Sequence, residues 1–381
     1  MPTRRRFCTS AVLLATHSHF LRGQGSPRID IAAIEHDRIL AEAAIALKSE
    51  PRSITTLTPP SQRTDPHEFY SEPETPGPEK PAFRAHAEAL LDCSAAVSAL
   101  TAAFVITQEA RYALKAGNHL YTWFVDPETR MNPSLKEAYG NATSATALAN
   151  GLVDGVALAE IARSIPFLVD TAALAPPDHA TVRTWFTDFL NWLNTSRTAL
   201  IARDTKDHTA SAWLLIASAC GRLLADDATL TACRHRLKAP TLRNQIQATG
   251  VFHHEVITQA PYRNTLFNFD LLAGACELLS TPFASLWPYE LEDGPGLRAV
   301  AAFLYPVLKN PGRWPYPADV SHFREVPRRR PALLLAGRAY LRPDYVDLWR
   351  SLPAPGPTDP LRASFPIRQP LLWVTRPPHN A

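Results

Sequence analysis

The sequence predicts an all-α protein whose helices pack in pairs, as a solenoid or as a closed (α/α) toroid. From residue 83 onward, apolar residues recur at three-, four- and seven-residue spacings, and no stretch shows the two-residue alternation of a half-buried strand. Proline-containing loops separate the apolar runs. Helices this apolar and this numerous must bury their faces against one another. No sequence repeat is sharp enough to choose between the two architectures.

The helices are expected in a regular succession along the chain. The first begins near residue 83 and carries Leu90, Val97 and Phe104 on one face. Asp178 is the expected N-cap of a later helix, and Pro343 is expected at the first position of a C-terminal helix. The apolar periodicity predicts further helices over residues 147–161, 178–193, 210–224, 266–279 and 297–308.

Two segments precede the helical domain, which is expected over residues 83–375. Residues 1–23 begin with three arginines, Arg4 to Arg6, before a short apolar stretch. This pattern is typical of a twin-arginine export signal, so a periplasmic or secreted protein is expected; a basic tail is the alternative. Residues 24–82 are rich in Pro, Ser, Thr and Glu. Residues 71–81 are expected to form a linker or surface segment without a core of its own.

Composition argues against several classes of partner. The net charge of +3 is small for 381 residues, and no basic run is interleaved with aromatics, so no nucleic-acid partner is expected. After the signal no segment approaches about twenty consecutive apolar residues, so neither a transmembrane helix nor a membrane partner is expected. The five cysteines form no CxxC motif and no Cys/His metal spacing. A monomer is expected.

One short segment could suggest a metal site. His253, His254 and Glu255 follow one another directly. Adjacent histidines are expected to point apart, and no third ligand is evident in the sequence. The sequence therefore predicts no metal and no cofactor, and leaves His254 as a candidate substrate contact.

The segment NHLYTWFVDPETRMNP, residues 118–133, carries unusual side-chain specificity. It runs from an apolar helical stretch into a loop with aromatic, acidic, basic and amide side chains. Trp123, Arg130 and Asn132 are candidate substrate contacts at the rim of a groove. The alternative is a purely structural loop, because Asp126 and Asn132 each precede a proline and are typical turn formers.

That segment also resembles the alginate-lyase-like polysaccharide lyases, and so do other segments between about residues 65 and 375. The resemblance implies an (α/α) toroid of helical hairpins around a groove and cleavage of uronic-acid polymers. The matching segments are HEFYSEP (67–73), RYALKAGNHLYTWFVDPETRMNPSL (111–135), GLVDGVALAEIARSI (151–165), WFTDFLNWLNTS (185–196), LRNQI (242–246), LFNFDLL (266–272), SLWPYELEDGPGL (285–297), RWPY (313–316) and PIRQPLLWV (366–374).

The chemistry implied by this resemblance is β-elimination at C5 of a uronate. The uronate carboxylate must be neutralised so that the C5 proton becomes acidic, a base must take that proton, and an acid must protonate the leaving oxygen. Members of the family supply these groups from an Asn-Asn-His-Gly motif and an Arg-Thr-Lys-Pro-Tyr-Gly-Tyr-Ser motif. Both motifs are altered in this sequence.

The first motif reads Lys-Asp-His-Thr at residues 206–209, so the histidine survives as His208 and the two amides become Lys206 and Asp207. In the second, at residues 258–265, the family's catalytic tyrosine falls on Asn264, while Tyr262 remains two residues earlier. An asparagine cannot act as base or acid at ordinary pH.

Two functional hypotheses follow from this altered set. In the first, the protein is a diverged lyase: His208 is the base or the neutralising donor, Lys206 and Arg263 grip the carboxylate, and Tyr262 is the acid. Asp207, Asn264 and His254 are further substrate contacts. In the second, the protein is an inactive pseudoenzyme that retains the toroid as an acidic-glycan-binding or structural module. His208 would then be a capping or core histidine, and Tyr262 a packing tyrosine.

Overall fold

The computed structural model describes residues 29–60, 65–73, 81–321, 327–356 and 358–378. The export signal expected at residues 1–23 lies outside the described residues. Within them the chain forms no β-strand, only isolated bridges. The α-helices are α1 (Ile31–Lys48), α2 (Ala85–Thr107), α3 (Ala110–Phe124), α4 (Ala145–Asn150), α5 (Ala157–Ser164), α6 (Pro176–Thr195), α7 (Arg197–Arg203), α8 (His208–Leu224), α9 (Asp227–Arg236), α10 (Leu242–Gln245), α11 (Pro261–Leu279), α12 (Leu297–Lys309), α13 (Pro331–Ala339), α14 (Pro343–Ser351) and α15 (Pro370–Val374). Short 3₁₀ turns lie at η1 (Ile54–Thr56), η2 (Gly151–Val156), η3 (Ile165–Phe167), η5 (Pro311–Arg313) and η6 (Arg362–Ser364), with a π turn at η4 (Leu237–Thr241).

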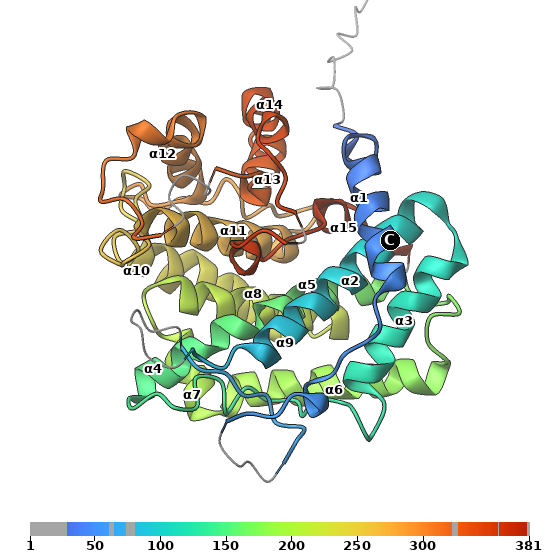
Figure 1. Ribbon diagram of the computed structural model, residues 1–381. Coiled ribbons are helices and arrows are strands. Elements are labelled where there is room, and N and C mark those ends of the chain that lie inside the picture. Colours follow the sequence, from blue (N-terminus) through green and yellow to red (C-terminus); the bar gives the residue numbers. More distant parts are fainter. Residues whose placement is uncertain (1–28, 61–64, 74–80, 322–326, 357, 379–381) are drawn as a thin grey trace, which may run out of the picture.

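The helices form the all-α toroid that the sequence predicts (Figure 1). A row of helices, α2, α5, α8, α11 and α13, packs one against the next. A second set flanks this row: α1 and α3 contact α2, α6 and α9 contact α8, and α12 and α14 contact α13. Because α8 and α11 have neighbours on nearly every side, most of their residues are buried. A histidine at the start of α8 is therefore held by a rigid element.

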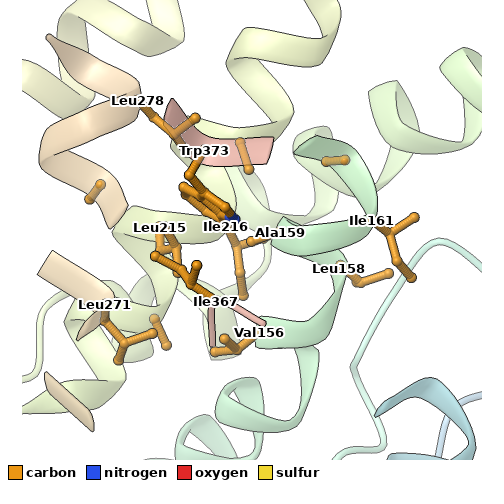
Figure 2. Close-up of a cluster of buried hydrophobic side chains, with 14 of the residues drawn as sticks. Val156, Leu158, Ala159, Ile161, Leu215, Ile216, Leu271, Leu278, Ile367 and Trp373 are labelled. Atoms are coloured by element: carbon orange, nitrogen blue, oxygen red, sulfur yellow. The ribbon is translucent and has the colours of Figure 1, made fainter. Parts of the chain in front are cut away.

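The core between α5, α8 and α11 is closed by the C-terminal segment (Figure 2). Ile367 and Trp373 pack there against Leu215 and Leu278. The Trp373 indole N–H donates to the buried carboxylate of Glu160 on α5, with Nε1 3.0 Å from Oε2. The C-terminal segment is thus an integral part of the toroid.

Helix α1 is an element that the sequence analysis does not predict, because it lies within the Pro-rich segment 24–82. Asp30 caps it by accepting from the Ala33 backbone N–H at 3.0 Å. Ile31, Ile39 and Ala43 on one face are buried in the core against α2. Of the expected linker, Ser71 is buried rather than exposed, and residues 74–80 lie outside the described residues.

The expected helix over residues 147–161 is instead broken into α4, η2 and α5. The break follows from close packing at two glycines. A Cβ at Gly155 would lie 2.3 Å from Leu135 Cδ1, and one at Gly151 would lie 2.7 Å from the carbonyl carbon of Ala138. Asp178 is not an N-cap, because α6 begins at Pro176 and Asp178 lies in its first turn. Pro343 does occupy the first turn of α14, as predicted.

The expectation that no later segment is long and apolar enough to span a membrane is wrong. Two described helical stretches meet that criterion, α2 and Ala145–Phe167, with mean hydropathies of 1.9 and 1.3. In the fold, 67% and 56% of these windows are buried. Their apolar character is what packing against α1, α3, α5 and α8 requires.

Candidate active site

The first residue of α8 is His208, and the preceding sequence explains why the helix begins there. Asp207 is the N-cap: its backbone is extended, and its Oδ1 accepts from the Thr209 backbone N–H at 2.9 Å. The Thr205 hydroxyl donates to the same carboxylate oxygen at 2.9 Å. Asp207 is thus occupied by local structure rather than by a substrate contact, and it fixes the position of the histidine.

The imidazole of His208 is held by Glu255, a fully buried carboxylate. Nδ1 of His208 lies 2.9 Å from Oε2, and the backbone N–H of His208 donates to Oε1 at 2.6 Å. An ionised carboxylate only accepts, so Nδ1 carries the hydrogen and Nε2 holds the lone pair of the neutral ring. The His208 side chain is 23% exposed.

The environment of His208 also sets its affinity for protons. Burial, to which the Phe267 ring contributes at a centroid distance of 5.8 Å, lowers the pKa of the imidazole. The charge and hydrogen bond of Glu255 outweigh this, helped by Asp207, and the net pKa of His208 is raised. The result is a histidine that titrates above its ordinary range, with one nitrogen fixed and the other available.

A buried polar network supports Glu255 from behind. The Asn268 amide donates to Oε1 of Glu255 at 3.0 Å and to the side-chain oxygen of Gln245 at 2.9 Å. The Ser211 hydroxyl donates to that same Gln245 oxygen at 3.1 Å. Ser211, Gln245 and Asn268 are each at most 1% exposed. Three helices, α8, α10 and α11, thus contribute to the buried network around one carboxylate, as expected of a supporting shell rather than a surface ion pair.

Lys206, His253 and His254 are basic residues next to His208 and Glu255 along the chain. His253 and His254 directly precede Glu255, and their ring centroids are 4.1 Å apart, so the expectation that they point apart is wrong. The pKa of His253 is lowered by burial first, then by the charges of His254 and of Lys206. Lys206 itself is exposed. No group of three or more His, Cys, Asp or Glu side chains suited to a metal ion occurs among the described residues.

Tyr262 lies in the core rather than at the surface. Its side chain is 0% exposed, and its ring centroid is 5.0 Å from that of Trp314. The backbone N–H groups of Tyr262 and Arg263 donate to Asp319 at 2.8 and 3.0 Å, which fixes the first turn of α11. Burial raises the pKa of the phenol further above its ordinary value. This placement supports the packing role of Tyr262 and not the role of acid toward a polymer bound from solvent.

Arg263 and Asn264 lie on the face of α11 that contains the residues in contact with His208 and Glu255. They are one helical turn before Phe267 and Asn268, whose side chains contact His208 and Glu255, so they share that face of α11. The Asn264 amide donates to the Thr258 hydroxyl at 3.2 Å. Both side chains are partly exposed. They are therefore placed to line the approach to the histidine.

The segment 118–133 does not supply rim contacts in the way that its side chains predict. Trp123 is 0% exposed and belongs to the core. The Asn132 amide donates to both Asp65 and Glu68 at 2.8 Å. Arg130 is exposed, but its backbone carbonyl lies 2.6 Å from Nδ1 of His67. These contacts fasten the loop to residues 65–72, and they support its alternative role as a structural loop.

Comparison with known proteins bears on this arrangement. The sequence model of the family described as alginate lyase matches residues 45–314. The chain belongs to the alginate lyase family.

Solved structures of alginate lyases share the fold. An alginate lyase from Bacteroides ovatus is 22% identical, with a TM-score of 0.76 over 91% of this chain and 94% of that one. Alginate lyase A1-III from Sphingomonas species A1 is 13% identical, with a TM-score of 0.51 over 89% of this chain and 95% of that one. A variant of A1-III complexed with a tetrasaccharide has a TM-score of 0.52. No match is found among the curated proteins.

Two motifs of the alginate lyase resemblance contain residues whose role the sequence analysis misses. LRNQI carries Gln245 and LFNFDLL carries Asn268, the two amides of the network behind Glu255. For Asn268, a polar side chain inside a largely apolar helical run is the signal in the sequence, whereas Gln245 lies in a polar segment that gives none. Glu255 drew attention only as a metal candidate, because nothing in the sequence pairs it with a histidine 47 residues away.

Proposed function

We propose that this protein is a polysaccharide lyase that cleaves a uronate-containing acidic polymer by β-elimination, with His208 moving the proton. The observation that carries the proposal is the Glu255 carboxylate bound to Nδ1 of His208 while Nε2 stays available. An imidazole oriented by a buried carboxylate is the arrangement that general acid–base catalysis requires. Membership of the alginate lyase family supports this class of reaction.

In the proposed reaction one residue takes and returns the same proton. Nε2 of neutral His208 removes the proton from C5 of the uronate. The electron pair forms the C4–C5 double bond as the bond from C4 to the bridging oxygen breaks. The imidazolium then donates its Nε2 proton to that oxygen, and His208 returns to its neutral form. This sequence needs no second acid, which fits the burial of Tyr262.

Neutralisation of the uronate carboxylate falls to the cations around His208. Lys206 is two residues before it, and Arg263 lies on the face of α11 that contacts it. Neither side chain makes an ion pair within the described part of the chain. A guanidinium and an ammonium so placed would stabilise the negative charge that develops on the carboxylate. His254 and the amide of Asn264 complete the proposed substrate contacts.

A specific observation also favours a second candidate, an inactive protein that binds acidic glycans. The tyrosine position of the family holds Asn264, which cannot donate a proton, and Tyr262 is buried. An A1-III variant of the same fold has been solved with a bound tetrasaccharide, which supports oligosaccharide binding by this architecture without requiring turnover. This candidate requires His208 to bind substrate without transferring a proton.

The experiment that separates the two uses the purified protein with alginate, glucuronan, pectate and glycosaminoglycans. Lyase activity predicts rising ultraviolet absorbance from the unsaturated uronate, which His208→Ala abolishes and the matched surface variant His36→Ala leaves intact. Calorimetric binding of one polymer without a rise in absorbance establishes the glycan-binding protein instead. Neither binding nor cleavage across the panel overturns both candidates.

The proposal includes the subcellular localisation of the protein. We infer export to the periplasm or beyond from the arginines at residues 4–6 before a short apolar run. Fusion of residues 1–40 to a reporter that is active only after export tests this. Substitution of Arg4, Arg5 and Arg6 by lysine should abolish its export, and unchanged export would refute the twin-arginine assignment.

A further inference from the structure

A cavity of about 320 Å³ lies on a different part of the toroid from His208. Its walls come from α1 and the residues just after it, α2, α3, Pro355, Gly356 and residues 362–368, and none of its lining residues belongs to α8, α11 or the 252–258 turn. Its volume is at the lower end of the range for small-molecule sites. The proposed lyase chemistry makes no use of this cavity.

Small side chains on α2 leave the space open. Ala89, Cys93, Ala96 and Ala99 recur every three or four residues, so they share one face of the helix, and all four line the cavity. Phe365 closes the apolar floor from the C-terminal segment. Helix α1 packs against α2 beside this face and does not fill it. The body of any occupant would therefore lie against apolar atoms.

The charged residues of the lining leave one positive charge in excess. Four arginines line the cavity, Arg38, Arg52, Arg362 and Arg368, against three carboxylates, Glu42, Glu50 and Asp92. Arg38 pairs with Glu42 at 2.9 Å, Arg362 pairs with Asp92 at 2.5 Å, and Glu50 pairs with Lys115 outside the lining at 3.3 Å. Every lining carboxylate therefore already has a cation as partner.

Arg368 is a half-buried cation that feels the charges of Glu160, Glu42 and Asp92 but forms an ion pair with none of them. Within the described residues its guanidinium makes no ion pair, and its Nη2 donates to the Arg362 carbonyl at 2.7 Å. Glu160 is close, but its oxygens already accept from the Arg368 and Gln369 backbones and from Trp373. Burial lowers the pKa of Arg368, which reflects the cost of this charge in its surroundings. A bound anion would offset that cost.

His119 supplies a second polar group to the wall. It lines the cavity from α3, is 3% exposed, and its Nε2 has no hydrogen-bond partner among the described residues. Burial, and then the Lys115 charge, lower the pKa of His119 to about 4. The ring is therefore neutral at neutral pH and adds no charge against a ligand. A buried polar atom without a partner is uncommon and calls for an explanation such as a ligand.

We propose that this cavity binds a small monocarboxylate with an apolar body. Arg368 holds the carboxylate, and the alanine face of α2 with Phe365 surrounds the body. A guanidinium fork matches two carboxylate oxygens, and Arg368 is the less exposed of the two lining arginines that make no ion pair among the described residues, Arg52 being exposed. The occupant would join α1, α2 and residues 362–368, which lie far apart in the chain.

The test compares octanoate with octanamide by calorimetry on the full chain. The two probes share an eight-carbon body and differ in charge. Octanoate is expected to bind one molecule per chain and about 10- to 100-fold more tightly than octanamide. In Arg368→Met this preference should vanish, while Arg130→Met, which removes an exposed arginine elsewhere, should leave it intact. Octanoate should also raise the melting temperature of the wild type.

A second variant keeps the proposal falsifiable if Arg368→Met does not fold. Ala96→Leu fills the cavity without changing charge, so it should abolish binding of both probes while far-ultraviolet circular dichroism stays that of the wild type. Equal affinity for octanoate and octanamide in the wild type overturns the proposal. So does undiminished octanoate binding by folded Ala96→Leu, because the probe would then be bound elsewhere.

Discussion

The two helix starts near the candidate active site differ in the residues that surround their side chains. At the start of α8, His208 is backed by Glu255 and a buried network of amides and a hydroxyl. At the start of α11, Tyr262 is backed by Trp314 and packs as an apolar ring. One segment thus keeps a group that can transfer protons and the other does not. We therefore expect proton transfer in the proposed reaction to rest on His208 alone.

Removal of the His208 imidazole is expected to have the largest effect on activity. In His208→Ala, turnover is expected to fall about 10³- to 10⁴-fold, because base and acid are removed together. The measurement is the initial rate of absorbance increase on the best polymer. A loss smaller than tenfold would show that another group moves the proton. Circular dichroism of His208→Ala should match the wild type, since the Asp207 cap of α8 is unaffected.

Replacement of the Glu255 carboxylate by an amide tests whether the orientation of the His208 ring matters for activity. In Glu255→Gln, the volume is kept but the ring loses the acceptor that fixes its tautomer, and a drop of about 10²-fold in kcat is expected. The dependence of activity on pH should also shift in Glu255→Gln. Glu255 raises the pKa of His208 against the effect of burial, so its loss lowers that pKa. The base must be neutral, and therefore the acid limb of the profile should move to lower pH. An unmoved limb would mean that another residue sets it.

Lys206 tests the cationic side of the site. In Lys206→Met, KM is expected to rise about three- to tenfold with little change in kcat, since an exposed ammonium contributes modestly to binding an anionic polymer. The difference should shrink as ionic strength rises. Lys309→Met, at the distant end of α12, serves as the matched control. An unchanged KM for Lys206→Met at low salt would remove this lysine from the proposed site.

Tyr262 gives the smallest expected effect. Tyr262→Phe keeps the ring against Trp314 and should change kcat less than about threefold, because the phenol is buried away from the polymer. A loss of a hundredfold, in a variant whose melting temperature is preserved, would restore Tyr262 as the acid. It would also require the first turn of α11 to move on binding substrate.

Much of the fold was predictable because it rests on local periodicity. The ranges of α8, α11 and α12 follow from apolar residues at helical spacing, and the succession of such helices indicates the toroid. The break at Gly151 and Gly155 was not predictable, since it depends on contacts with residues 135 and 138. Helix α1 was missed because its Pro-rich surroundings obscured a helix that buries only one face.

The candidate site was predictable only in part. His208 stood out because it is the residue of the Asn-Asn-His-Gly motif that is kept at residues 206–209. Glu255, the carboxylate that orients the His208 ring, is 47 residues away in the chain and reaches it only in the tertiary structure. For Trp123 and Asn132, side-chain type predicted sugar contacts that the structure does not support. Trp123 is buried in the core, and the Asn132 amide donates to Asp65 and Glu68. Residue type states what a side chain can do, and packing decides what it meets.

The two hydrogen bonds between Glu255 and His208 restrict the motion of the 252–258 turn. One carboxylate binds both the backbone and the ring of His208, so it ties the 252–258 turn to the start of α8. Because the folded pKa of His208 is raised, the stability gained from this tie is full below the unfolded pKa and is lost as pH rises through the folded value. The turn should therefore open more often once the ring gives up its proton. Faster amide hydrogen exchange at residues 255–258 in alkaline solution, after correction for the intrinsic rate, would record that opening.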